Sequence, residues 1–452
     1  MLRTRYTHLN TRLIHSAQAL LIAGMMLLAS GPAHALTLLR DAGLEHGLAR
    51  LAAPVLRGAG LIPGQIKILI VKDDALNAFV TDTRHIFVTS GLIQKLNSAS
   101  ELQAVLAHEA AHIANGHLSR RAGNARAAST TAGLGVALAA ASLALSGRGD
   151  AATGLALGAQ SAARRNFLAH TRAEESAADL SSVRILRRAG IDPTASLRVL
   201  DHFRGQEALS ARRQDPYARS HPLTRARIRA LEATVAGLPT QPKDDPTTAY
   251  WFVRIQAKLQ GFLRAPAWNL RRAKSDPYPD VAALRRAVAH HRKADLSAAL
   301  RAIDHALKIR PKDGFLTDLK AEILLKNRQF KDAARVYGRA VNMTDGHPLV
   351  RGGHGRALLA SGQIRAALKA LEAARARDMA DVGVLRDLAV AYARSKRPGQ
   401  ASLVTAERYL LQGRMADANL HATRAQGQLR RGTKSWNRAM DVLHATKGAD
   451  TR

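Results

Sequence analysis

The sequence predicts a mainly helical protein in which an α+β domain with a small sheet is followed by a solenoid of helical repeats. Alanine and leucine are abundant, and aromatic residues make up only 4% of the 452 residues, a composition that favours helix over strand. A single short run in the first third is dense in β-branched residues. In the last third, a four-residue motif recurs every 34 residues, which indicates repeated helix pairs.

The first 35 residues have the pattern of a secretory signal peptide. Three arginines and no acidic residue precede an apolar stretch, residues 17–29, that is shorter than a bilayer span requires. The triplet Ala-His-Ala at 33–35 fits the rule for cleavage after small residues, so we expect the mature chain to begin at Leu36. A signal of this bacterial type predicts export to the periplasm; a retained N-terminal anchor is the alternative.

Composition excludes several classes of site and partner. Cysteine is absent, so disulfides, thiolate metal sites and a cysteine nucleophile are excluded, and any metal must be held by histidines and carboxylates. The formal charge of +33 would suit nucleic acid, anionic lipid or acidic proteins. No nucleic-acid-binding motif is present, and the predicted export argues against that partner. Peripheral association with anionic lipid and a merely solvated arginine-rich surface remain open.

Hydrophobic periodicity and capping residues predict the helices and strands of the first domain. Residues 40–60 fit an amphipathic helix, and the run Ile-Lys-Ile-Leu-Ile-Val at 66–71 fits a strand. Residues 79–81 and 85–88 flank a polar triplet and predict a hairpin. A helix is expected to begin near Ser98, because the tetrapeptide Ser-Ala-Ser-Glu that starts there fits a capping box.

The pentapeptide His-Glu-Ala-Ala-His at 108–112 lies on that helix. Positions i and i+4 share a helix face, so His108 and His112 can offer two imidazole nitrogens to one zinc ion. Glu109 lies beside them, where it can take a proton from water, as in the H-E-x-x-H motif of zinc peptidases. His117, at i+5 from His112, turns off this face, and we interpret it as structural.

A third ligand is predicted on a later helix, which should cover about 164–188. Glu175 and Asp179 lie four residues apart there, so both face one way. Glu175 can bind the zinc while Asp179 accepts a hydrogen bond from the second nitrogen of a ligand histidine. Glu174 is the rival ligand, with neighbours that fit less well. One Zn²⁺ per chain is therefore expected.

Residues 127–163 are dominated by small and apolar side chains. The runs 130–146 and 151–163 each fall short of a full bilayer span. They predict either two helices packed through small residues, or a segment that dips into a membrane or covers the active site. Full spans, which would make the chain an integral membrane protease, are a third reading. Another helix is expected over about 194–207.

The last part of the chain is a repeat. Leu296-Ser-Ala-Ala, Phe330-Lys-Asp-Ala and Ile364-Arg-Ala-Ala follow one another at 34 residues, the tetratricopeptide period. Met415-Ala-Asp-Ala is offset by 51 residues, which predicts an irregular junction with an extra helix near 382–395. Upstream, residues 237–248 are rich in Pro, Asp and Thr and predict a linker.

Several stretches occur in the order found in one peptidase family. They are Asn77-Ala-Phe79, Ile86-Phe-Val-Thr-Ser-Gly-Leu92, Glu101-Leu-x-x-Val-Leu-Ala-His-Glu-x-x-His112, Glu175-x-x-Ala-Asp179 and Ser220-His-Pro222. With these residues the chain resembles the HtpX-like gluzincin peptidases, metallopeptidase family forty-eight. The signal peptide and the repeats make it similar to the BepA/YfgC-type periplasmic branch of that family. The resemblance covers about 40–235 by motif and 281–443 by architecture.

This resemblance implies a zincin-type metalloprotease domain and roles for further residues. Substrate would add as a β-strand to an edge formed by Phe87, Val88 and Thr89. His221 could occupy the open zinc position and hold the enzyme latent, and Arg227 could steady an oxyanion. The chain would then divide into a signal peptide (1–35), a metalloprotease domain (36–236), a linker with a bridging helix (237–280), a repeat domain (281–443) and a flexible tail (444–452).

The expected function is that of a periplasmic zinc endopeptidase acting on misfolded or stalled proteins, in outer-membrane protein assembly and quality control. The repeat array would contact substrate or the outer-membrane assembly machinery. The alternative from another class is a chaperone or adaptor of that assembly whose peptidase site is latent.

Overall fold

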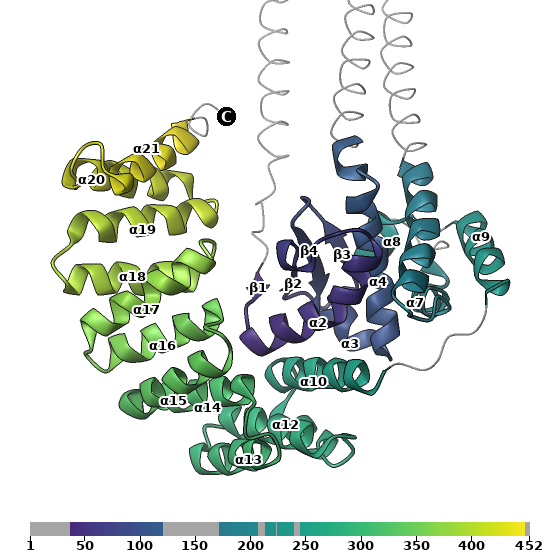
Figure 1. The fold of residues 1–452 in the computed structure, drawn as a ribbon, viewed down its shortest axis with the longest axis horizontal. Coiled ribbons are helices and arrows are strands. Elements are labelled where there is room, and N and C mark those ends of the chain that lie inside the picture. Colours follow the sequence, from purple (N-terminus) through teal and green to yellow (C-terminus); the bar gives the residue numbers. More distant parts are fainter. Residues whose placement is uncertain (1–36, 121–170, 207–212, 223, 239–244, 448–452) are drawn as a thin grey trace, which may run out of the picture. The chain divides into compact units, whose positions relative to one another are not determined.

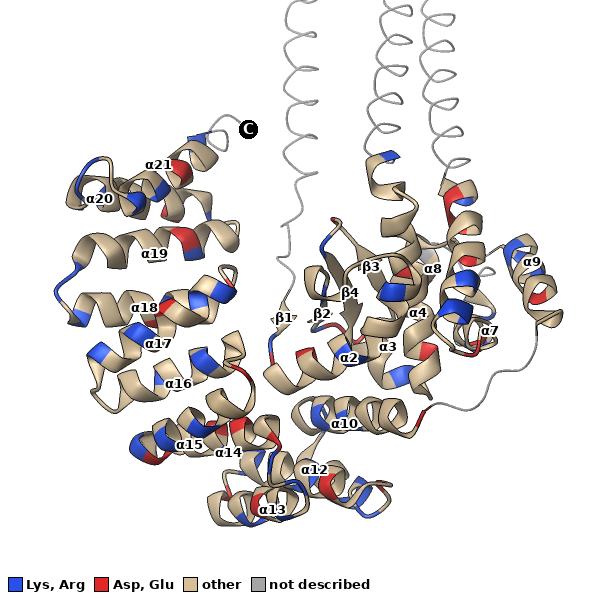
Figure 2. Ribbon diagram, in the orientation of Figure 1, with Lys and Arg blue, Asp and Glu red and all other residues tan. Residues whose placement is uncertain are grey.

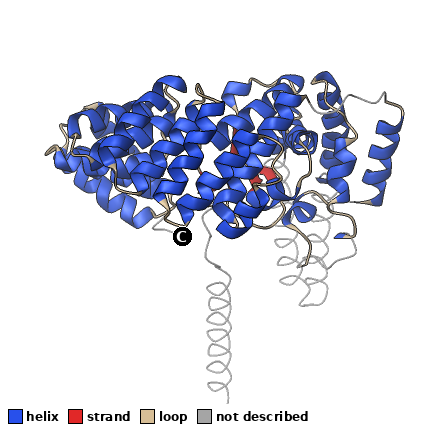
Figure 3. Cartoon of the chain, turned by 90° about the horizontal axis from the view of Figure 1, so that it is seen from below, coloured by secondary structure: helices blue, strands red, loops and turns tan. Residues whose placement is uncertain are grey.

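The computed structural model describes the parts of the chain that hold the predicted site and the repeats, namely residues 37–120, 171–206, 213–222, 224–238 and 245–447 (Figure 1). The predicted signal peptide and the apolar segment 127–163 lie outside these residues. None of the helices in the described part of the chain has the length and apolar character that a membrane crossing needs. Within the described residues, helices predominate and strands are confined to one small region (Figure 3), which confirms the predicted mainly helical α+β fold.

The sheet has four strands in the order β1-β2-β4-β3. Their bounds are Leu38–Leu39 for β1, Lys67–Val71 for β2, Ala78–Val80 for β3 and His85–Thr89 for β4. β2 pairs in parallel with β4, and the two outer pairings are antiparallel. The predicted strand and hairpin are therefore confirmed. The β-branched residues of β2 and β4 supply buried side chains, among them Ile70, Ile86 and Val88.

Two long helices bury the sheet and hold the first domain together. α2 (Ala42–Gly58) begins at Asp41, whose carboxylate accepts a hydrogen bond from the Leu44 N–H at 2.9 Å. α4 (Ala99–Ala114) is buried along almost its whole length. Leucines of both helices share one apolar core with the strands. The short helices η1 (Pro63–Gln65) and α3 (Ser90–Lys95) connect these elements.

The C-terminal part of the first domain supplies further helices around α4. Residues 171–188 are helical, as predicted for that stretch. α7 (Ala195–Asp201) is shorter than the predicted helix over 194–207. α8 (Pro216–Ser220) and α9 (Arg225–Ala236), which sequence patterns did not single out, complete this group.

Three helices connect the first domain to the repeats. They are α10 (Pro246–Leu263), α11 (Pro266–Arg272) and α12 (Pro279–Arg292). Each begins with a proline in its first turn, where the missing N–H would be unpaired in any case. α10 packs on both α2 and α12 and is the bridging helix expected within residues 237–280.

The repeat array contains the helix predicted near 382–395, and the predicted irregular junction is confirmed. Its helices are α13 (Leu296–Ile309), α14 (Gly314–Lys326), α15 (Phe330–Met343), α16 (Pro348–Ala360), α17 (Ile364–Arg377), α18 (Val382–Arg394), α19 (Pro398–Leu411), α20 (Met415–Gln428) and α21 (Lys434–Lys447). The 34-residue period continues into α19, where Pro-Gly-Gln-Ala hides the motif by placing proline at its apolar position. Met415 starts the second helix of a pair, because α20 packs on α19 as extensively as the two helices of each earlier pair pack on one another. The predicted tail from 444 also begins too early, because α21 reaches Lys447.

Candidate metal centre

The capped helix α4 positions three of the predicted site residues. The Ser98 hydroxyl accepts a hydrogen bond from the Glu101 N–H at 3.2 Å, as a capping box requires. The reciprocal bond departs from the motif, because the Glu101 carboxylate accepts from the N–H of Asn97 at 2.9 Å and not from that of Ser98. The helix then carries His108, Glu109 and His112 into the buried interior.

Four buried residues converge on one point: His108 and His112 from α4, Glu175 from the helix at 171–188, and His221 at the end of α8. One ligand atom from each lies within 4.8 Å of all the others. The Nε2 atoms of His108 and His112 are 3.1 Å apart, and Glu175 carboxylate oxygens lie 3.3 Å and 3.5 Å from them. His221 Nδ1 is 3.3 Å from His108 Nε2 and 2.9 Å from Glu175 Oε2.

This donor set fits zinc. Ligand atoms around a tetrahedral zinc ion with bonds of 2.0–2.1 Å are about 3.3 Å apart. The distances among these nitrogen and carboxylate atoms, from 2.9 to 3.5 Å, bracket that separation. Three imidazoles and one carboxylate are also ligands that zinc prefers in proteins. Glu174, the rival ligand, is not part of this cluster and lies 3.9 Å from the Arg120 guanidinium.

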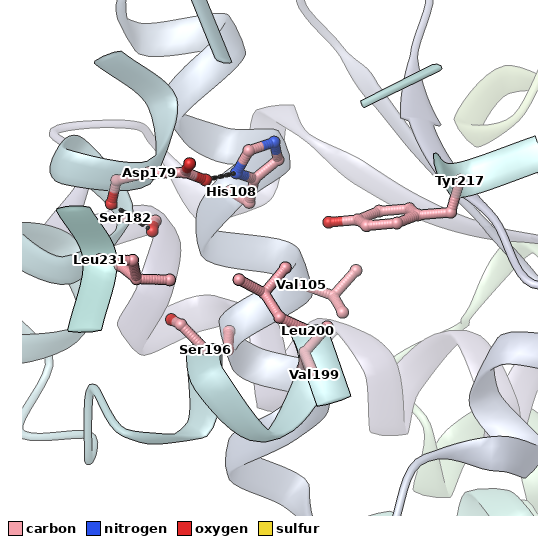
Figure 4. A pocket seen from close by; sticks show the side chains of 10 residues that line it. Val105, His108, Asp179, Ser182, Ser196, Val199, Leu200, Tyr217 and Leu231 are labelled. Carbon is pink, nitrogen blue, oxygen red and sulfur yellow. Dashed lines mark hydrogen bonds and ion pairs between the residues drawn. The ribbon is translucent and has the colours of Figure 1, made fainter. Parts of the chain in front are cut away.

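Asp179 supports the cluster from behind His108. Its Oδ1 lies 3.2 Å from His108 Nδ1 (Figure 4), whereas the other ligands lie near His108 Nε2. The Arg227 guanidinium holds the same carboxylate with two hydrogen bonds of 2.8 Å and donates a third to the Pro222 carbonyl. Arg227 is thus engaged in orienting Asp179, and this geometry does not favour the oxyanion role implied by the family resemblance.

His117 is not one of the clustered ligand residues, as expected, but it contacts one of them. Its Nδ1 lies 2.8 Å from His112 Nδ1, so each metal-facing histidine of α4 has a partner on its second nitrogen. The helical spacing argument failed because α4 ends at Ala114. Gly116 then adopts a φ of +69°, which turns the chain back toward His112.

Glu109 lies beside the ligand cluster without being part of it. Its side chain is fully buried, and Oε1 is 3.4 Å from His221 Nε2. The same His221 nitrogen lies 3.3 Å from the backbone carbonyl of Ala78 in β3. His221 therefore contacts the ligands through one ring nitrogen, and the sheet and Glu109 through the other.

Tyr217 is a site residue that sequence patterns did not reveal. It lies one turn before His221 on α8, and the two rings are 4.7 Å apart. Its other face stacks on Phe203 at 4.6 Å, and its backbone N–H donates to the Leu76 carbonyl at 3.1 Å. These contacts hold α8 against the chain that leads into β3, and so position His221.

Charge complementarity keeps the carboxylates of the site ionised. Burial alone would lower the pKa of His108, but Asp179 and Glu175 outweigh it and raise that pKa to about 10. Burial alone would raise the pKa of Glu175, yet His221 and His108 hold it well below its usual range. The pKa of Asp179 is likewise lowered, by His108 and Arg227 against burial.

A small cavity lies next to His108, between α4, α7, α8 and α9. Figure 4 shows Tyr217 directing its hydroxyl toward this space from one side and Asp179 closing it from the other. Ser182 fixes the backbone there by donating to the Asp179 carbonyl at 2.7 Å. The cavity measures about 20 Å³, which is room for about one water molecule.

The predicted substrate edge is wrong in one respect. Phe87, Val88 and Thr89 belong to β4, which lies between β2 and β3 and has no free edge. Phe87 pairs with Leu69 on one side and with Phe79 on the other. The edge strand next to the site is β3, whose Ala78 carbonyl faces His221.

Asp179→Asn is expected to lower zinc affinity by about 10–100-fold, the usual effect of losing a partner behind a ligand histidine. Asparagine has nearly the same shape, but it offers Arg227 and His108 one oxygen and no charge. Competition with a chromophoric chelator measures the affinity. Asp201→Asn, at an exposed aspartate paired with Arg204, is the control; equal affinities in the two variants would contradict the prediction.

Comparisons with known proteins converge on the same region of the chain. Residues 39–235 match the model of peptidase family M48. The beta-barrel assembly-enhancing protease of Escherichia coli K12 is 25% identical over 191 residues, 42% of this chain and 39% of that protein. The mitochondrial metalloendopeptidase OMA1 of Schizosaccharomyces pombe is 28% identical over 188 residues, 41% of this chain and 51% of that protein.

The matches do not extend to the whole of these relatives, since the aligned region spans about two-fifths of the Escherichia coli protein and half of the yeast one. Among solved structures, MamA 41-end from Desulfovibrio magneticus RS-1 is similar, at 19% identity and a TM-score of 0.32. The match covers 36% of this chain and 93% of the MamA chain.

Proposed function

We propose that this protein is a zinc-dependent endopeptidase that hydrolyses peptide bonds of unfolded or stalled proteins. The match of residues 39–235 to the model of peptidase family M48 supports the proposal. The observation that carries the proposal is the convergence of His108, His112 and Glu175 with Glu109 beside them. A zinc site with three such ligands, a general base next to it and a fourth position for water is the arrangement of zinc peptidases.

The chain's own residues would divide the chemistry among them. His108, His112 and Glu175 would hold the zinc, which when bound polarises the scissile carbonyl and lowers the pKa of water. Glu109 would take the proton from the attacking water and then deliver it to the leaving amine. Asp179 and His117 would keep the two α4 imidazoles in the tautomer that leaves Nε2 free for the metal.

The substrate would add to β3, the edge strand next to the site. Thr89 donates its backbone N–H to the Asn77 carbonyl, so by the alternation of antiparallel pairs Ala78 and Val80 direct their backbone groups away from β4. A peptide that pairs there would gain main-chain hydrogen bonds irrespective of its sequence. The Ala78 carbonyl currently faces His221, at 3.3 Å.

His221 would act as a latency switch. With Nδ1 among the ligand atoms it occupies the position that water needs, and with Nε2 near Ala78 it also covers the substrate edge. Cleavage would then require α8 to move away from β3. This requirement also keeps a second function open, that of a chaperone or adaptor whose peptidase site stays closed.

His221→Ala is expected to cleave an unfolded β-barrel protein faster than the unmodified chain does. The substitution removes the imidazole that occupies the position for water and covers the substrate edge of β3. Gel analysis of the digest over time measures the rate, and chelator-treated samples show that cleavage depends on the metal. Control variant His305→Ala changes an exposed histidine of α13 and should behave like the parent. If neither the parent nor His221→Ala cleaves the substrate, the endopeptidase proposal fails and the chaperone function is favoured.

We further propose that the protein works in the periplasm, after removal of residues 1–35, in the assembly and quality control of outer-membrane proteins. The support is the leader pattern of the sequence and the similarity to the beta-barrel assembly-enhancing protease. The repeat array would contact substrates or the assembly machinery, because stacked helix pairs offer extended binding surfaces. The basic surface would suit peripheral contact with anionic lipid.

A further inference from the structure

A second cavity lies between the start of α2 and three helices of the repeat array, α14, α16 and α18, and none of the zinc ligands lines it. Its volume is about 330 Å³. Asp41 contributes from the start of α2, and Asp318 and Glu322 contribute from α14. Figure 2 shows basic residues spread over the helices of the array and acidic residues at α14. An acidic recess in a chain of formal charge +33 is a local reversal of sign.

Two carboxylates in this cavity lack a donor. Asp318 is only 8% exposed, and within the described residues it has neither a hydrogen-bond donor nor an ion-pair partner. Glu322 lies one turn further along α14, on the same face, and also has none in that part of the chain. Buried carboxylates are normally paired, because a charge removed from water without a partner costs several kcal/mol.

Most of the cations around the cavity are already engaged in ion pairs. Lys258 of α10 is buried and binds Asp41 at 2.7 Å. Arg356 of α16 forms an ion pair with Asp387 at 2.6 Å.

Arg40, ahead of α2, is bound to Asp378 at 2.6 Å, and Lys326 is exposed on α14. The remaining acidic group, Asp381, caps α18 by accepting from two backbone N–H groups.

Among the described residues, Lys258 is thus the buried ammonium near Asp41, Asp318 and Glu322, and Lys326 is the lining cation that has no ion pair. With Asp41 paired to Lys258, Lys326 is left to balance both Asp318 and Glu322, so negative charge is in excess.

Burial and the neighbouring carboxylates shift the pKa values of the cavity in one direction. Burial, with Asp41 and Glu322 adding to it, raises the pKa of Asp318 to about 8, although Lys258 opposes the shift. Burial and Asp41 raise the pKa of Glu322 in the same direction. The buried Tyr337 hydroxyl of α15 has a pKa raised above its usual value and stays neutral. When no ligand is bound, the raised pKa values favour protonation of these two carboxylates, which reduces the negative charge in the cavity.

We propose that this cavity binds the arginine or lysine side chain of an extended peptide segment, with Asp318 and Glu322 as its carboxylate partners. The cavity wall includes Leu325, Leu349 and Val384, which suit the alkyl stem of such a side chain. A small inorganic cation would make no use of that apolar wall. The site is also separate from the zinc ligands, so it can hold a substrate or partner whether or not cleavage occurs.

Binding of the short peptide Ala-Leu-Arg-Leu-Ala, labelled with a fluorophore, tests the proposal against a peptide with citrulline in place of arginine. Citrulline keeps the shape and removes the charge. Zinc-loaded protein carrying Glu109→Gln is used so that neither peptide is consumed. Fluorescence anisotropy should show the arginine peptide binding about tenfold or more tightly, since hydrogen bonds between two charged partners are the strong ones.

Asp318→Asn combined with Glu322→Gln should abolish the preference for arginine. Asp332→Asn combined with Asp417→Asn removes the same charge from exposed positions and should retain it. Because a cation binds the ionised carboxylates, affinity for the arginine peptide should rise as pH increases through about 8 in the parent and stay flat in the cavity variant. Circular dichroism confirms that both variants are folded.

Three results would overturn the proposal. The first is equal affinity for the arginine and citrulline peptides. The second is an undiminished preference for arginine in the folded cavity variant. The third is displacement of the arginine peptide by calcium or magnesium at low concentration, which would mark the cavity as a metal site.

Discussion

Glu109→Gln is expected to reduce cleavage of an unfolded protein by roughly 10²- to 10⁴-fold, the range in which a positioned general base contributes. Glutamine retains the size of the buried side chain, but it cannot accept a proton. The ligand cluster does not include Glu109, so the variant should keep about one zinc per chain. Single-turnover digestion, together with metal analysis of the same sample, measures both quantities.

Glu232→Gln, at an exposed position of α9, is the matched control for the loss of one carboxylate. It should cleave at the parental rate. If Glu109→Gln retained its zinc and cleaved as fast as this control, Glu109 would not be the base, and the proposed mechanism would fall. Loss of zinc from Glu109→Gln would instead show that the site depends on the carboxylate for its assembly.

His112→Ala is expected to lose zinc and cleavage together. The substitution removes one of the two imidazoles that α4 directs at the cluster, and it leaves the His117 ring without the nitrogen it contacts. The loss of zinc affinity should exceed the about 10–100-fold expected for Asp179→Asn, because a ligand is removed and not its supporting partner. Zinc content after dialysis against a weak chelator measures the effect.

The exposed His305→Ala provides the comparison for His112→Ala, and far-ultraviolet circular dichroism shows whether the fold survives. A folded His112→Ala protein with parental zinc content would contradict the proposed ligand set. Together with Glu109→Gln, this variant separates the two requirements of the site, because one removes the metal and the other removes only the base.

Local patterns predicted the elements on which the site is built. The capping box at Ser98 and the spacing of the motif placed His108 and His112 on one helix face, because helical geometry links residues within one or two turns. The same reasoning placed Glu175 and Asp179 together. The 34-residue repeat predicted the array, and the offset copy at Met415 predicted its irregular junction, although proline at the start of α19 concealed one copy.

Predictions from the sequence failed at two places where the result depends on how the chain turns or pairs outside a regular helix. His117 is five residues from His112, and helical spacing alone turns it away. The left-handed turn at Gly116 brings it back within 2.8 Å. Similarly, the hairpin of β3 and β4 was predictable as a pair, but which strand lies at the edge depends on the parallel pairing of β4 with β2.

By itself, the sequence determined the zinc-ligand motifs, the helix that carries the first of them and the repeat architecture, because each depends on neighbours a few residues apart. Tertiary structure decided what fills the fourth position of the cluster, which strand is free to pair and where unpartnered charge collects. His221 meets His108 across 113 residues of chain, and Lys258 meets Asp41 across 217. Such contacts arise from packing between segments that are distant in the sequence, and local periodicity does not predict them.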